Sequence, residues 1–127
     1  MKAAYLDTSC LVAIAFGEPD ARRVKRAMAT YKVRFASNLL EAELKAALAR
    51  ENVAFEPGLL GELDWVQPER PLSPEIDRTL GEGYVRGADL WHLACALYVR
   101  PHVPGMAFVT LDRRQKEIAA ALGFEVP

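Results

Sequence analysis

Short apolar runs alternate along this chain with longer stretches whose apolar residues follow helical spacing, and this alternation limits the fold more than any other feature. Apolar runs that predict strands lie at residues 3–6, 33–36, 65–66, 107–111 and 124–126. Helical spacing is found between them, over residues 20–31, 38–52, 74–85, 89–99 and 112–122. Such an alternation predicts a parallel sheet with helices packed on its faces.

The composition fits one domain that spans residues 1–127. Hydrophobic residues make up 51% of the 127 residues and charged residues 26%, which is typical of a globular chain with a core. Because the 16 basic side chains nearly balance the 17 acidic ones, the net charge neither indicates nor excludes a nucleic-acid partner. Any contact with phosphate must therefore be local or run through a metal ion.

The N-terminal residues and the two cysteines are typical of a cytoplasmic protein. Cys10 and Cys95 lie in apolar stretches without the spacing of metal ligands, which is typical of buried thiols in a reducing cytoplasm. Residues 7–9 interrupt the first apolar run before it is long enough for a secretion signal. No segment approaches the roughly 18 apolar residues of a membrane span. We expect a cytoplasmic protein that does not enter a membrane.

Two aspartates stand where predicted strands end. Asp7 follows the first strand and Asp112 follows the fourth, and ligands of open parallel sheets bind beyond such strand ends. Each aspartate also precedes a helix, so a helix cap is an equally open interpretation for either residue alone.

Glu43 lies on the apolar side of the helix predicted over residues 38–52. Helical spacing places it beside Leu39, Leu40 and two alanines, where a carboxylate is costly unless something compensates its charge. Glu41 points nearly the opposite way and precedes Lys45 by four residues, as in a solvated ion pair. The helical register therefore favours Glu43 over Glu41 as a functional residue.

Asp89 begins the helix predicted over residues 89–99, at the edge of its apolar stripe, where an N-cap is again the alternative. His92 follows within the same turn and is interpreted mainly as a structural histidine, although it could transfer a proton. If Asp7, Glu43, Asp89 and Asp112 converge, a divalent cation would relieve their repulsion. Oxygen ligands favour Mg²⁺ or Mn²⁺ over zinc, and such an ion can activate water for attack on a phosphodiester.

The same residues resemble the motifs of the PIN-domain family and, within it, of the VapC toxins. The resemblance covers essentially the whole chain, and its motifs occur in order at suitable spacing. The matching segments are Tyr5-Leu6-Asp7-Thr8-Ser9, Ser37-Asn38-Leu39-Leu40-Glu41-Ala42-Glu43-Leu44, Arg86-Gly87-Ala88-Asp89-Leu90-Trp91-His92-Leu93-Ala94, Phe108-Val109-Thr110-Leu111-Asp112 and Gly123-Phe124-Glu125-Val126.

The resemblance implies a three-layer α/β/α sandwich around a parallel sheet of about four or five strands. It also implies Mg²⁺-dependent endonucleolytic cleavage of RNA, a homodimer, and a cognate antitoxin protein that blocks the site. Asp7, Asp89 and Asp112 would then bind the metal, while Glu43 would bind it or position the attacking water. Asp112 occupies the motif position that varies most in the family.

Other polar residues near these motifs have two interpretations each. Thr8, Ser9 and Thr110 could hold the carboxylates in place by hydrogen bonds, or they could serve ordinary cap and turn chemistry. Arg86 precedes Asp89 by three residues and is a possible phosphate contact. Arg113, with its neighbour Arg114, could contact phosphate or simply be exposed.

Three other functions stay open from the sequence. A non-catalytic PIN-like module would bind RNA or a protein partner. A phosphatase or phosphotransferase would use Asp7 as a nucleophile, although a common version needs a second aspartate where Ser9 stands. A small α/β domain could also use all of its aspartates as helix caps.

Overall fold

The computed structural model describes residues 2–127 and contains a four-stranded parallel sheet. The strands are β1 (Ala3–Leu6), β2 (Val33–Ser37), β3 (Asp64–Val66) and β4 (Ala107–Val109), in the spatial order β3-β2-β1-β4. The helices are α1 (Thr8–Ala15), α2 (Ala21–Thr30), α3 (Leu39–Arg50), α4 (Ser73–Glu82), α5 (Gly87–Val99) and α6 (Arg113–Ala121), with short 3₁₀ turns at Pro57–Leu60 and Arg100–His102.

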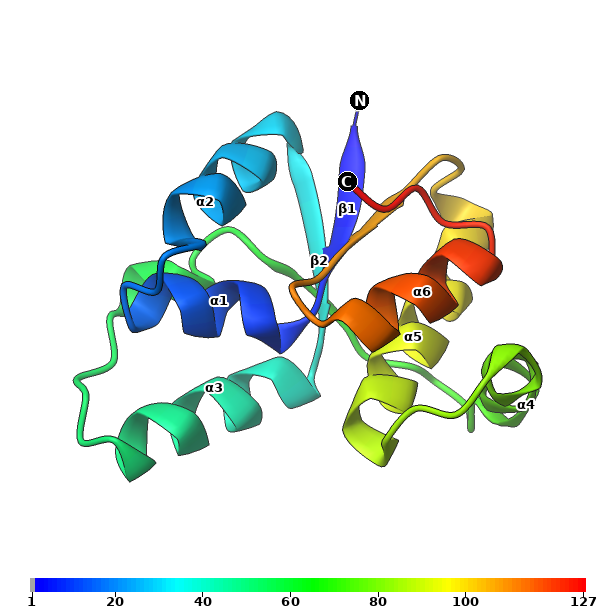
Figure 1. Cartoon of the computed structure of the whole chain (residues 1–127). Coiled ribbons are helices and arrows are strands. Elements are labelled where there is room, and N and C mark those ends of the chain that lie inside the picture. The colour runs from blue at the N-terminus through cyan, green and yellow to red at the C-terminus, as the bar shows by residue number, and fades with distance from the viewer. Residues whose placement is uncertain (1) are drawn as a thin grey trace.

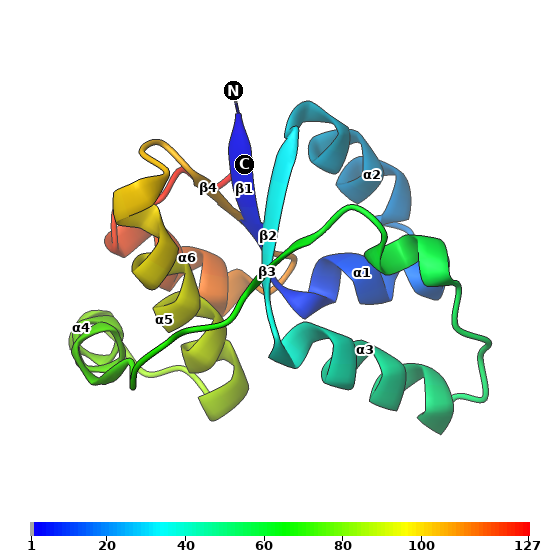
Figure 2. The same cartoon turned by 180° about the vertical axis from the view of Figure 1, so that it is seen from behind.

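The helices form two layers on opposite faces of the sheet. Figure 1 shows α1, α2 and α3 on one face and α4, α5 and α6 on the other, with the sheet seen nearly edge-on between them. The reverse view shows the same division, with β3 crossing in front of β2 (Figure 2). The predicted three-layer α/β/α fold is therefore confirmed, with four strands in the sheet.

The alternation of side chains along β1 explains why both faces need cover. Ala3 and Tyr5 pack into the core beside α5 and α6, whereas Ala4 and Leu6 pack into the core beside α1 and α2. All four residues are buried, as expected for a central strand with helices on both sides. The Tyr5 ring stacks on Phe108 of β4 with centroids 5.4 Å apart, which ties the two neighbouring strands together.

Several predicted elements differ from the observed ones. Residues 124–126 form only an isolated bridge between Ala107 and Glu125, not a strand. Helix α1 occupies a stretch that helical spacing did not delimit, although Asp7 was expected to precede a helix. Helix α5 begins two residues earlier than predicted, at Gly87, so that Asp89 lies inside its first turn.

Two compositional expectations can be compared with the described residues. Cys10 and Cys95 are both buried and free, as expected for thiols in apolar stretches. Within residues 2–127, no helix has the length and apolar character required to cross a membrane.

Candidate active site

The elements that carry the four acidic residues meet at one edge of the sheet. Asp7 directly follows β1, Asp112 directly precedes α6, Glu43 lies on α3, and Asp89 lies in the first turn of α5. Figure 1 shows the beginnings of α1, α3, α5 and α6 below the carboxyl ends of the strands. The topology therefore brings four distant parts of the sequence to the edge where parallel sheets bind ligands.

Asp7 is a buried carboxylate, with only 3% of its surface exposed. Its oxygens accept hydrogen bonds from Ser9 Oγ at 2.6 Å and Thr110 Oγ1 at 2.8 Å. Burial raises the pKa of Asp7 to about 6, because these hydrogen bonds and the nearby His92 offset only part of the lost hydration. Asp7 occupies the N-cap position of α1, but its side chain makes no capping hydrogen bond.

The hydroxyls beside Asp7 fulfil both roles that the sequence left open. Ser9 Oγ donates to Asp7 and accepts the Leu111 backbone N–H at 2.9 Å. Thr110 Oγ1 donates to Asp7 and accepts the Asp112 backbone N–H at 3.0 Å. Each hydroxyl thus shapes the turn after β4 and orients the carboxylate at the same time.

Glu43 is half-buried and is held by groups from two other helices. Thr8 Oγ1 donates to Glu43 Oε1 at 2.6 Å, and His92 Nε2 lies 2.7 Å from the same oxygen. Burial favours the neutral form of Glu43, but the hydrogen bonds from His92 and Thr8 outweigh it and lower its pKa. Glu41 instead forms the predicted surface pair with Lys45.

His92 is 1% exposed and links Glu43 to the end of β2. Because an ionised carboxylate only accepts hydrogen bonds, His92 Nε2 carries the hydrogen that faces Glu43. The other nitrogen, Nδ1, lies 3.2 Å from Ser37 Oγ and 3.3 Å from the Tyr5 hydroxyl. The sequence indicated a structural histidine here, but gave no sign that its partner would be Glu43.

Asp89 and Asp112 line one pocket of about 260 Å³. Burial raises the pKa of Asp89, and the negative charge of Asp112 raises it further. Asp112 accepts the Gln115 backbone N–H at 2.7 Å and so caps α6. Helix α5 has Arg86 at its N-cap position, so the alternative in which Asp89 caps the helix is wrong.

The basic residues divide between this pocket and open solvent. Arg86 and Arg114 line the pocket with the two aspartates, as does Tyr84. Arg113 lies outside the pocket lining, and its guanidinium faces Glu117 at 3.4 Å. The sequence singled out Arg86 for phosphate contact but gave Tyr84 no role. Tyr84 lay at the end of the helix predicted over residues 74–85, whereas α4 ends at Glu82 and leaves Tyr84 in the connection to α5.

The chemistry of these residues fits a divalent metal ion. Within residues 2–127, no group of three or more acidic, histidine or cysteine side chains lies close enough to enclose a metal. Mg²⁺ does not need such a cage, because it is commonly held by one or two carboxylates together with water and substrate phosphate. Burial raises the pKa values of Asp7 and Asp89, a neighbouring carboxylate raises each further, and a bound cation would favour the ionised forms of both.

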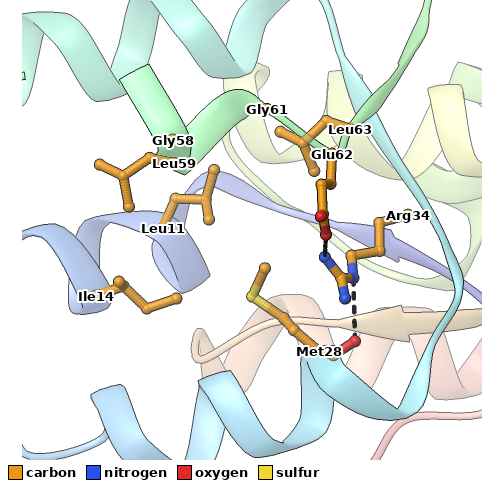
Figure 3. Close-up of a pocket in the computed structure, with 9 residues that line it drawn as sticks. All are labelled: Leu11, Ile14, Met28, Arg34, Gly58, Leu59, Gly61, Glu62 and Leu63. Atoms are coloured by element: carbon orange, nitrogen blue, oxygen red, sulfur yellow. Dashed lines mark hydrogen bonds and ion pairs between the residues drawn. The ribbon is translucent and has the colours of Figure 1, made fainter. Parts of the chain in front are cut away.

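A second cavity is larger but contains none of the four acidic residues. It has a volume of about 450 Å³ and lies between α1, α2 and the turn at Pro57–Leu60. Figure 3 shows its apolar side chains around Arg34, which donates to Glu62 at 2.9 Å and to the Met28 carbonyl at 3.0 Å. Arg34 and Glu62, the two charged residues that line this cavity, are paired with each other, so the cavity offers no free charged group for phosphodiester chemistry.

Comparison with known families agrees with this geometry. A sequence model of the PIN domain matches residues 4–121, so the chain belongs to the PIN-domain family. PIN domains are typically metal-dependent nucleases, and the match therefore supports nuclease activity with a divalent ion in general terms. No curated protein matches the sequence closely enough to count as a relative.

Proposed function

We propose that this protein is a metal-dependent endoribonuclease that hydrolyses RNA phosphodiester bonds with carboxylate-bound Mg²⁺ or Mn²⁺. The observation that carries the proposal is Asp7. It is a buried carboxylate at the carboxyl end of the central strand pair, oriented by two hydroxyls, with a pKa raised to about 6. Buried carboxylates with strongly raised pKa values are concentrated at functional sites.

The roles of the residues follow from their surroundings. Asp7, Asp89 and Asp112 would hold the metal, one or two of them directly and the rest through bound water, and the ion would supply a Lewis acid and lower the pKa of that water. Glu43, kept ionised by Thr8 and His92, would accept a proton from the attacking water or complete the metal site. Arg86, in the pocket beside Asp89, would bind a substrate phosphate.

Metal dependence is the first test of this proposal. Purified protein freed of any bound partner should cleave RNA with Mg²⁺ or Mn²⁺, and EDTA should stop the reaction. Asp7→Asn should reduce cleavage by at least a hundredfold, because the neutral amide is a poor metal ligand. Cleavage that survives both EDTA and this substitution would rule out the metal mechanism.

The two glutamates of α3 provide a matched pair of variants. Glu43→Gln should reduce cleavage by at least tenfold, because Glu43 bonds to Thr8 and His92 at the site. Glu41→Gln should leave cleavage unchanged, because Glu41 pairs with Lys45 at the surface. The reverse ranking would show that another face of α3 meets the substrate.

The finer proposal is that the nuclease is a VapC-type toxin, acting as a homodimer and blocked by a cognate antitoxin protein. It is supported by the order and spacing of the four acidic motifs. Expression alone should slow growth, a small co-encoded protein should relieve the effect, and light scattering should give the mass of a dimer. Normal growth with an active enzyme would remove the toxin assignment and leave the nuclease.

The same assays distinguish the remaining alternatives. A non-catalytic binding module would retain RNA or a protein partner but would show no cleavage under any metal. A phosphatase that uses Asp7 as nucleophile would release phosphate from monoesters and leave RNA chains intact. These outcomes would replace the endoribonuclease proposal.

A further inference from the structure

Tyr84 stands out among the large apolar side chains because 72% of its surface is exposed. Within residues 2–127, the other large hydrophobic side chains that are exposed are Leu80 at 43%, Val53 at 37% and Trp65 at 36%. Tyr84 also lines the pocket that contains Asp89 and Asp112, so its exposed ring offers a face on which a planar ligand group can stack.

The backbone that carries Tyr84 is fixed although its ring is exposed. Arg114 Nε donates to the Tyr84 carbonyl at 3.1 Å. At the preceding Gly83, where φ is 156°, a Cβ atom would lie 2.6 Å from the Arg114 guanidinium and 2.8 Å from Ile118. The connection between α4 and α5 therefore packs closely against α6, and the ring is presented from a defined position.

The surroundings of Tyr84 combine two kinds of charge. The pocket that Tyr84 lines is also lined by two acidic residues, Asp89 and Asp112, and by two basic residues, Arg86 and Arg114. Arg114 approaches Glu117 only at 3.5 Å, and across residues 2–127 Arg86 forms no ion pair. The Arg86 guanidinium is therefore available to a phosphate that lies beside the aspartates.

We propose that Tyr84 and Arg86 form a nucleotide subsite in which an unpaired base stacks on the Tyr84 ring while its phosphate binds Arg86. This inference rests on the proposed nuclease function and assigns the two residues that would hold one unpaired nucleotide of the RNA substrate. Stacking on an aromatic ring tolerates any base, whereas a base inside a duplex has no free face. The subsite would thus select unpaired segments without reading their sequence.

Binding of a fluorescent single-stranded RNA, measured by anisotropy in the Asp7→Asn background, tests the subsite without cleavage. Tyr84→Leu, which keeps a large apolar side chain but no ring, should weaken binding about tenfold. Tyr84→Phe should stay within about twofold, because the ring remains. Leu80→Ala, at an exposed residue outside the pocket lining, should have no effect.

In the otherwise unchanged protein, Tyr84→Leu should raise KM with little change in kcat, and a duplex RNA should show no Tyr84 dependence. The inference is overturned if Tyr84→Leu binds single strands like the wild type, if Tyr84→Phe is equally damaging, or if the substitution weakens only a protein complex. Cleavage without Tyr84 dependence would reject the subsite and retain the nuclease. Tyr84-dependent binding without any cleavage would retain the subsite and reject the nuclease.

Discussion

At the scale of single residues, the site combines one carboxylate that burial disfavours with another that its neighbours keep ionised. The pKa of Asp7 is raised to about 6, mainly by burial, whereas that of Glu43 is lowered by hydrogen bonds from His92 and Thr8. The pKa of Asp7 therefore lies above its ordinary value and that of Glu43 below it, so that ionisation of the two groups affects stability in opposite directions, and each effect can be measured without substrate.

Asp7→Asn should stabilise the metal-free protein at neutral pH. A raised pKa in the folded state means that ionising Asp7 costs stability, a cost absent below the ordinary pKa of 3.8 and complete above about pH 6. Without metal, the variant should gain about 2–3 kcal/mol in unfolding free energy at pH 8 and almost nothing at about pH 3. Denaturant titrations at both pH values provide the measurement.

The matched measurement adds Mg²⁺ to both proteins. The unfolding free energy of the wild type should rise with the Mg²⁺ concentration, because a ligand that binds only the folded state stabilises that state. The unfolding free energy of Asp7→Asn should rise much less. Equal or lower stability of the variant at pH 8 would contradict the assigned cost of the buried charge.

Thr8→Val tests the hydroxyl that bonds Glu43 while preserving the shape of the side chain. Loss of the 2.6 Å hydrogen bond should raise the pKa of Glu43, lower the unfolding free energy by about 1 kcal/mol, and reduce cleavage about tenfold. Thr30→Val is the control, since the Thr30 hydroxyl bonds only the Arg26 carbonyl of its own exposed helix. Similar activity losses in both variants would argue against a specific role for Thr8.

At the scale of secondary structure, the beginnings of the helices explain how the acids are presented. Asp112 caps α6, Asp89 lies in the first turn of α5, and Asp7 precedes α1 without capping it. The positive end of a helix dipole favours carboxylates at such positions. The cap interpretation therefore accounts for Asp112 but not for Asp7, whose buried side chain makes no capping hydrogen bond, or for Asp89, which lies inside the first turn.

Asp112 can be tested for two roles by two substitutions. Asp112→Ala should lower the unfolding free energy by about 1 kcal/mol, because the Gln115 N–H loses its acceptor. Asp112→Asn keeps an acceptor and should retain stability, yet it should weaken Mg²⁺ binding measured by calorimetry. Unchanged Mg²⁺ affinity in both variants would leave Asp112 as a cap alone.

At the scale of the whole molecule, the site depends on how β1 and β4 are held together. Leu6 pairs with Val109 in the parallel register, which places Thr110 beside Asp7. The stacked rings of Tyr5 and Phe108 lie on the α5 and α6 side of this strand pair. Core packing and carboxylate orientation are therefore consequences of the same register.

Phe108→Ala should lower the unfolding free energy by about 3–5 kcal/mol, because it empties space against Tyr5 and Phe124 in the core. The gentler Phe108→Leu should fold and still lose part of the Mg²⁺-induced stabilisation, since the β1–β4 contact supports Asp7. Phe55→Ala, at a half-buried ring distant in sequence, should cost less stability and leave the Mg²⁺ effect intact. Chemical unfolding with and without Mg²⁺ decides between these outcomes.

The sequence alone determined the features that depend on short-range periodicity. The strand at β1, the solvated pair of Glu41 and Lys45, and the inward side of α3 at Glu43 all follow from spacing within one element. Boundaries were less predictable. Strand β4 was expected to reach residue 111 but ends at Val109, just before Thr110, and the sequence did not delimit α1.

Only the tertiary structure decided which of these residues meet. Glu43 bonds to Thr8, 35 residues away in the sequence, and to His92, 49 residues away, while the Tyr84 ring is exposed although its backbone carbonyl bonds to Arg114. Local spacing fixes the direction of a side chain within its own element. Its partners depend on strand order and register, which are set by the packing of the whole core.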